Sequence, residues 1–151
     1  MTKTAIIYAS IHHKNTFKVA NFVAQSINAD ILDVLHDNVD ISQYDTIIFA
    51  SGIYFGKFHK GLLNFVEKQE LQGKRVIAFY TCGMKFGDYA KGLKKLLLKQ
   101  GAVYLGDVYC RGYDTYGIWG KLGGIARKHP NDNDIARVTE SIGKLLSNNN
   151  L

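Results

Sequence analysis

Short apolar runs alternate with helical patterns along this chain, and the alternation restricts the fold more than any other feature. Three of the runs are continuous blocks of Ile, Val, Ala, Phe and Tyr: Ile6–Tyr8, Ile47–Phe49 and Val76–Phe79. Continuous rather than alternating hydrophobicity is typical of parallel strands that are covered on both faces. The pattern predicts five strands: Thr4–Ala9, Asp30–Val34, Asp45–Ala50, Arg75–Tyr80 and Val103–Cys110.

Between these runs, apolar residues recur at helical spacing. Asp88 precedes one such stripe as an expected N-cap, and Pro130 precedes the last. The connection from Leu35 to Tyr44 is expected to hold no more than a short helical turn. Strand–helix alternation predicts an α/β fold, a doubly wound five-stranded parallel sheet, as one domain over residues 1–151. The stripes are Val19, Val23 and Ile27; Leu62, Leu63 and Val66; Tyr89, Leu93, Leu96 and Leu97; and Ile135, Val138, Ile142, Leu145 and Leu146.

Composition and cysteine usage indicate the expected cellular location of the chain and the state of its thiols. The 151 residues are 46% hydrophobic, and no apolar run approaches a membrane span, so we expect no stable membrane insertion. The N-terminus lacks the features of a signal peptide, which favours a cytoplasmic location. Cys82 and Cys110 are too few for a disulfide framework and are expected to be reduced, half-buried thiols, with a redox pair as the alternative.

The chain is basic, with a formal net charge of +6 and a pI of about 9.3. Such a charge concerns partners and solubility rather than fold. No nucleic-acid-binding motif accompanies it, so we expect no nucleic acid partner. The charges admit two explanations: a solvated helix face, or a docking surface for an acidic redox protein. The residues concerned are Lys91, Lys94, Lys95 and Lys99 in one expected helix and Lys121, Arg127 and Lys128 in a late loop.

The unusual residues gather in the loops that follow four of the strands. In a doubly wound sheet, ligands bind beyond the carboxyl ends of the strands, where the strand order reverses. The connections at the opposite end, such as Asn28–Ala29, are brief and plain. The four loops are Ser10–Asn15, Ser51–Lys57, Thr81–Gly87 and Arg111–Pro130.

The first loop leads directly into a helix, and a helix N-terminus favours phosphate through its free N–H groups and its dipole. Ser10, Asn15 and Thr16 can add donors, and the run His12, His13, Lys14 raises the local positive potential; ordinary helix capping by Asn15 or Thr16 is the alternative. Adjacent histidines rarely reach one ion together, and no carboxylate or cysteine lies nearby in sequence, so we predict no metal site.

The other loops combine glycines with aromatic residues. Tyr54 and Phe55 can stack on a flat ring system, or cover the end of the sheet. The fourth loop is aromatic from Gly112 to Trp119, and its length is typical of a functional segment. One phosphate site beside such loops indicates a mononucleotide with a planar ring. A dinucleotide fold, a Walker phosphate loop and a phosphoacceptor receiver domain are rejected, because their glycine, lysine and aspartate motifs are missing.

Three segments resemble the short flavodoxins: Tyr8–Thr16, Ser51–Lys57 and Arg111–Gly117. Ser51–Val66 is also similar to the flavodoxin-type protoporphyrinogen oxidases, which carry an aromatic-Gly-x-x-His run. The resemblance covers nearly the whole chain and implies the strand order 2-1-3-4-5 with non-covalently held FMN. It implies phosphate ligands in the first loop and ring contacts in the second and third. The expected cofactor-binding residues are Ser10, His12, Lys14, Asn15 and Thr16 for the phosphate, and Ile53, Tyr54, Phe55, Gly56, Thr81, Cys82, Gly83, Met84 and Gly87 toward the ring.

This chain departs from the family pattern at Lys14, where a glycine usually precedes the Asn-Thr pair. If the position needs a positive φ, lysine costs about 1 kcal/mol, which pairing with the phosphate can offset. Three functions stay open: an FMN electron carrier without catalytic residues, a flavin oxidoreductase acting on a quinone or porphyrinogen, and a module with weak or lost FMN binding. The electron carrier is the leading prediction, because FMN itself carries the chemistry.

Overall fold

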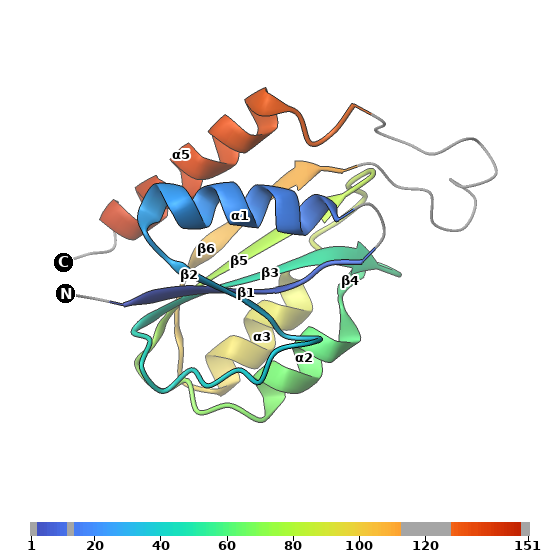
Figure 1. The fold of residues 1–151 in the computed structure, drawn as a ribbon. Coiled ribbons are helices and arrows are strands. Elements are labelled where there is room, and N and C mark those ends of the chain that lie inside the picture. The colour runs from blue at the N-terminus through green and yellow to red at the C-terminus, as the bar shows by residue number, and fades with distance from the viewer. Residues whose placement is uncertain (1–2, 12–13, 113–127, 149–151) are drawn as a thin grey trace.

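The computed structural model describes residues 3–11, 14–112 and 128–148. At its centre is a twisted parallel sheet in which β1 lies between β2 and β3, followed by β5 and β6, so that the order is β2-β1-β3-β5-β6 (Figure 1). The short β4 pairs antiparallel with the end of β3. Apart from β4, this is the predicted order 2-1-3-4-5, and the doubly wound fold is confirmed. The strands are β1 (Thr4–Ala9), β2 (Asp30–Asp33), β3 (Thr46–Tyr54), β4 (Lys57–Phe58), β5 (Arg75–Cys82) and β6 (Val103–Arg111).

Helices cover both faces of the sheet, as continuous apolar strands require. Two pack on one face, α1 and α5, and two on the other, α2 and α3 (Figure 1). The predicted stripes supply their buried sides: Val19 and Val138 reach one core, and Leu62 and Leu93 reach the other. No helix among the described residues is long and apolar enough to cross a membrane. The helices are α1 (Asn15–Ile27), α2 (Lys60–Glu67), α3 (Lys91–Lys99) and α5 (Asp132–Asn148).

Two local predictions were wrong, for the end of β3 and for the N-cap of α3, whereas the expectation for the connection from Leu35 to Tyr44 was confirmed. Strand β3 runs on to Tyr54, because the chain folds back and β4 supplies ladder partners for a segment expected to be loop. The connection from Leu35 to Tyr44 holds turns and no helix; the Asp33 carboxylate accepts from the Leu35 N–H at 2.9 Å and so favours a turn. Helix α3 has Ala90 rather than Asp88 as its N-cap, although the Asp88 carboxylate accepts from the Ala90 N–H at 3.2 Å.

The two cysteines are fully buried rather than half-buried, and both are free. Cys110 lies opposite Thr81 in the β5–β6 register, so Cys82 is one residue out of phase with it. Side chains alternate between faces along a strand, and the two thiols accordingly belong to opposite cores. Burial raises the pKa of Cys110 to about 12. The sheet itself therefore separates the thiols, and the redox pair is rejected.

Candidate functional site: the strand-end loops

The turn from β1 into α1 is set by a left-handed residue. Lys14 has φ 53° and ψ 33°, and α1 begins at the next residue. This position therefore needs the positive φ that a glycine would supply most cheaply. The Ser10 hydroxyl accepts from the Phe17 N–H at 3.2 Å, and the first turn of α1 contains no acidic residue. The positive end of the helix dipole thus faces the loop without a neutralising carboxylate.

A buried hydrogen bond links this loop to the end of β5. The hydroxyls of Thr16 and Thr81 lie 2.9 Å apart, and both side chains are buried. Sequence reasoning assigned these residues to two different parts of the cofactor site. The structure brings them together beneath the loops, where they fix the start of α1 against the sheet. Their contact with a ligand stays a prediction.

Gly112 brings the end of β6 against the same helix start. Its N–H donates to the Cys82 carbonyl at 2.9 Å. A Cβ at this position would lie 2.6 Å from Nδ2 and 3.0 Å from Cβ of Asn15, so only glycine allows this approach. Arg111, its neighbour, donates through Nε to the Gly83 carbonyl at 3.0 Å. Sequence reasoning left both residues out of the site; the glycine at a strand end was the available signal.

The loop after β3 is a tight hairpin. Phe55 and Gly56 have φ values of 53° and 76°, as in the turns that match the twist of a two-stranded hairpin. Asparagine and glycine are the usual residues there, and a bulky side chain at positive φ is an outlier. Phe55 is nevertheless 84% exposed, whereas Ile53 and Tyr54 are half-buried. The predicted ring-binding residues of this loop therefore occupy both sides of a strained hairpin tip.

His59 fixes the far end of the hairpin. Its N–H donates to the Ser51 hydroxyl, and its Nδ1 accepts from the Gly61 N–H, both at 2.9 Å, so the ring caps α2. Accepting at Nδ1 requires a neutral ring, and burial lowers the pKa of His59 below its ordinary value. The ring also packs edge-on against Tyr54, with centroids 5.2 Å apart. This histidine of the aromatic-Gly-x-x-His run is a structural anchor here.

The loop after β5 begins buried and ends exposed. Thr81, Cys82 and Gly83 are buried, whereas Met84 and Gly87 are exposed. The Tyr89 hydroxyl donates to the Met84 carbonyl at 3.2 Å and accepts from the Phe86 N–H at 2.9 Å. Tyr89 thus shapes the loop, although its helical spacing indicated only a core residue.

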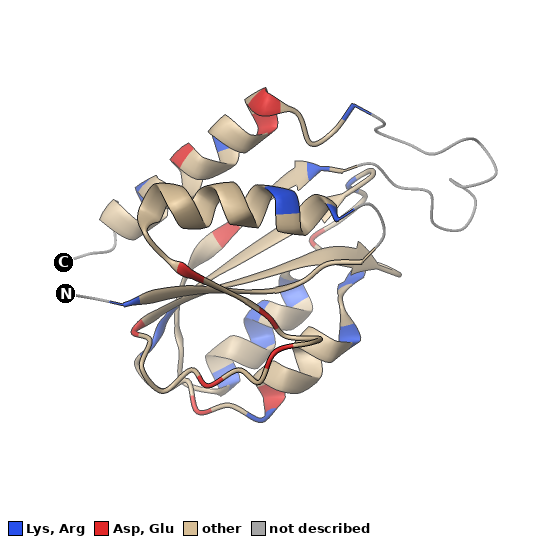
Figure 2. Cartoon of the chain, in the orientation of Figure 1, with Lys and Arg blue, Asp and Glu red and all other residues tan. Residues whose placement is uncertain are grey.

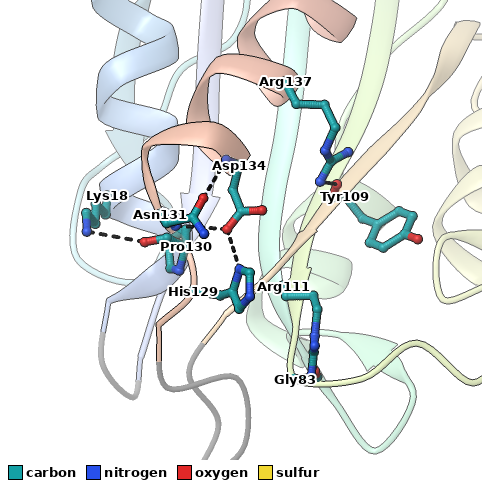
Figure 3. Close-up of polar contacts among 9 residues, drawn as sticks. All are labelled: Lys18, Gly83, Tyr109, Arg111, His129, Pro130, Asn131, Asp134 and Arg137. Atoms are coloured by element: carbon teal, nitrogen blue, oxygen red, sulfur yellow. Dashed lines mark hydrogen bonds and ion pairs between the residues drawn. The ribbon is translucent and has the colours of Figure 1, made fainter.

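The chain returns to this edge of the sheet at the start of α5 (Figure 3). Asn131 and Asp134 cap the helix reciprocally: the Asp134 N–H donates to the Asn131 amide oxygen at 2.9 Å, and the Asn131 N–H donates to the Asp134 carboxylate at 2.8 Å. His129 bonds the same carboxylate. Burial alone would raise the pKa of Asp134, but these hydrogen bonds outweigh it and lower that pKa. Lys18 of α1 reaches the Pro130 carbonyl at 3.4 Å, which joins the segment to the first helix.

Part of the predicted site lies outside the described residues. His12 and His13 do, and so do residues 113–127 of the long aromatic loop. The described ligand candidates from three loops all lie at the carboxyl edge of β1, β3 and β5.

The fold and its loops define the class of this protein: an open, doubly wound α/β protein whose strand-end loops form the edge where such sheets bind ligands. The flavodoxin domain family matches residues 5–119. An uncharacterized protein from Methanocaldococcus jannaschii is 42% identical over 149 residues, which cover 97% of this chain and 99% of that protein.

Solved flavodoxin structures share the fold. Oxidised Flavodoxin 2 from Bacillus cereus superposes with a TM-score of 0.73 at 18% identity and covers 97% of this chain and 99% of that one. A flavodoxin from the domain Archaea gives 0.67 at 15% identity, with 96% and 97% covered. The chain belongs to the flavodoxin family.

Proposed function

We propose that this protein binds FMN without a covalent bond and carries electrons between redox partners. Membership of the flavodoxin family supports a flavin cofactor. The single observation that carries the proposal is the left-handed turn at Lys14, which aims the N-terminus of α1 at the edge formed by the other loops. A helix N-terminus favours phosphate, because its free N–H groups and the positive end of its dipole face the ligand.

The residues present fit the phosphate of FMN. The first turn of α1 carries no carboxylate, so no fixed negative charge repels the ligand. Ser10 already accepts from the Phe17 N–H, and its hydroxyl hydrogen can point toward a phosphate oxygen. Lys14 is exposed and adds a positive charge at the turn. Ser10 and Lys14 would thus hold the phosphate, together with Asn15, the first residue of the helix.

The residues of the second and third loops would orient the ring. Tyr54 is half-buried and fixed by its contact with His59, so it can offer a stationary aromatic surface. In the third loop, Tyr89 fixes the backbone around Met84 and Phe86. FMN, when bound, supplies the redox chemistry, and the protein supplies the binding and the electrostatics.

Comparing FMN with riboflavin tests the phosphate site directly. The purified protein is titrated with each, and binding is followed by quenching of flavin fluorescence. Charge-assisted hydrogen bonds contribute about 1.5–3 kcal/mol each, so we expect FMN to bind at least about 10-fold more tightly than riboflavin. Ser10→Ala should reduce this preference, and Ser147→Ala, at the far end of α5, should leave it unchanged.

Two outcomes would contradict the proposal. Equal affinity for FMN and riboflavin would show that the turn at Lys14 holds no phosphate, and absence of binding would identify a flavodoxin fold that has lost its cofactor. Turnover of a quinone or a porphyrinogen without a protein acceptor would instead favour a substrate-specific oxidoreductase.

A further inference from the structure

Large apolar side chains are exposed on two neighbouring loops at the carboxyl edge of the sheet. Phe55 is 84% exposed, Phe86 73% and Met84 40%. The two loops are close, since a Cβ on Gly56 at the hairpin tip would lie 3.9 Å from the Tyr89 ring. We call these three side chains the apolar patch. An exposed apolar cluster of this kind marks a binding surface.

The conformation of Phe55 makes the patch more significant. A phenylalanine at φ 53° costs about 1 kcal/mol or more relative to asparagine or glycine, and as an exposed residue it regains little of this by burial. Strained residues of this kind cluster at functional sites. The strained turn presents the phenyl ring at the outermost point of the hairpin.

Positive charges lie at the same edge of the sheet as the apolar patch. We call Lys14, Lys57, Lys85 and Arg111 the basic rim; Lys14 follows β1, Lys57 begins β4, Lys85 follows β5 and Arg111 ends β6. Among the described residues, none of the four takes part in an ion pair. Lys85 instead lies over the Tyr109 ring, 4.3 Å from its centroid. Among the described residues of the loops after β1, β3, β5 and β6, Asp88 is the one acidic residue, and Asp132 and Asp134 follow in the first turn of α5.

A group of negative charges lies away from the apolar patch, whereas Asp88 and the first turn of α5, with Asp132 and Asp134, lie at the loop edge (Figure 2). Five of the chain's 13 acidic residues fall on β2 and on the connection to β3, at the other margin of the sheet. The β2 side of the sheet is therefore rich in carboxylates, whereas the loops of the apolar patch carry more basic than acidic residues. Such an arrangement steers and orients a partner whose contact surface is negative. The acidic residues are Asp30, Asp33, Asp37, Asp40 and Asp45.

We propose that the apolar patch and the basic rim form a docking surface for an electron-transfer protein whose redox centre is surrounded by carboxylates. This inference rests on the proposed function, because the surface adjoins the expected flavin. Apolar contacts at the centre with charges at the margin are the usual arrangement of a protein interface. A phosphate backbone would leave the apolar patch uncovered, so a protein partner fits better than a nucleic acid.

Rapid mixing tests the docking surface. The FMN-loaded, oxidised protein is mixed with a reduced acidic two-iron ferredoxin, and one electron passes from the iron–sulfur cluster to the flavin. A second portion of the ferredoxin has its carboxylates amidated. The variant K57E/K85E reverses two charges of the basic rim, and K68E/K99E makes the same change at the opposite ends of α2 and α3. FMN affinity is measured first for every variant.

Electrostatic steering changes association rates by about 10-fold or more, so we expect the rate to fall about 10-fold between low and high salt. K57E/K85E should lower the low-salt rate about 10-fold, and K68E/K99E less than about 2-fold. Amidated ferredoxin should lose the salt dependence.

Photoreduced deazaflavin, a neutral reductant, serves as the control for bound, reducible FMN. If it reduces the flavin, then equal effects of the two double variants, or a rate that rises with salt, would overturn the docking surface alone. Failure to bind FMN, or failure of that neutral reductant to reduce it, would overturn the proposed function as well.

Discussion

Lys14 and Phe55 have the same positive φ of 53°, but the two loops are held in different ways. The Lys14 turn is fixed from beneath by the Thr16–Thr81 hydrogen bond and by the contact of Asn15 with Gly112. The Phe55 turn is fixed by the hairpin pairs Ile53–Phe58 and Tyr54–Lys57 and by the contacts of His59 at its far end. The first loop is thus built into the core and the second projects from it. This difference suits a rigid phosphate site beside a surface that meets other molecules.

The largest expected effect on the free energy of unfolding comes from filling the space between Gly112 and Asn15. Gly112→Ala places a methyl group against that side chain, and overpacking of this kind costs about 1–3 kcal/mol. Urea unfolding should show this loss, and FMN affinity should fall with it. Gly92→Ala is the matched control, because its added methyl meets open space in α3 and should stabilise the helix by about 0.5–1 kcal/mol. If Gly112→Ala were as stable as the wild type, the Lys14 loop would be no more rigidly held than the hairpin.

Replacing each strained residue with asparagine compares the two turns directly. Asparagine tolerates positive φ, as Asn28 does at the end of α1 with φ 55°. Lys14→Asn and Phe55→Asn should each raise the free energy of unfolding by about 1 kcal/mol. FMN titration then separates them: Lys14→Asn should weaken binding through the lost charge, and Phe55→Asn should weaken it less. Tighter FMN binding by Lys14→Asn would instead mean that the lysine impairs the site.

The sequence predicted the parts of this molecule that depend on local patterns. Continuous apolar strands such as Ile47–Phe49 can only lie inside a covered sheet, so the fold and its ligand-binding edge followed. The hairpin was not predicted, because Phe55 is a poor residue for its turn and only the pairing with β4 holds it there. Contacts such as Thr16–Thr81, 65 residues apart, leave no local signal at all.

The two loops should also respond differently to acid. The Lys14 loop is anchored by hydroxyls, whereas the hairpin is anchored by neutral His59. The pKa of His59 is lowered in the folded chain, so the unfolded chain binds the proton more readily. The stabilisation that neutral His59 gives to the folded chain is full above the unfolded pKa of about 6.5. It is lost as the pH falls through the lower folded pKa.

Protonation removes the cap of α2, at a cost of about 0.5 kcal/mol. Urea midpoints measured from pH 8 to pH 5 should fall for the wild type and fall less for His59→Asn, which keeps a capping side chain. The same slope in both proteins would assign the pH dependence to other groups.

The smallest expected effect concerns the reduction potential of bound FMN. A positive charge near the flavin stabilises the anionic reduced form, so this basic protein should have a less negative potential than an acidic flavodoxin. Lys14→Gln keeps the side-chain length and the strained φ while removing the charge. One screened charge at this range contributes about 0.3–0.5 kcal/mol, so the potential should become more negative by about 10–20 mV. Spectroelectrochemical titration measures this shift.

Lys99→Gln, at the far end of α3, removes the same charge and should change the potential less, because screening limits the effect to charges near the flavin. Equal shifts in the two variants would show that net charge sets the potential, and the Lys14 turn would then bind the phosphate without tuning the ring.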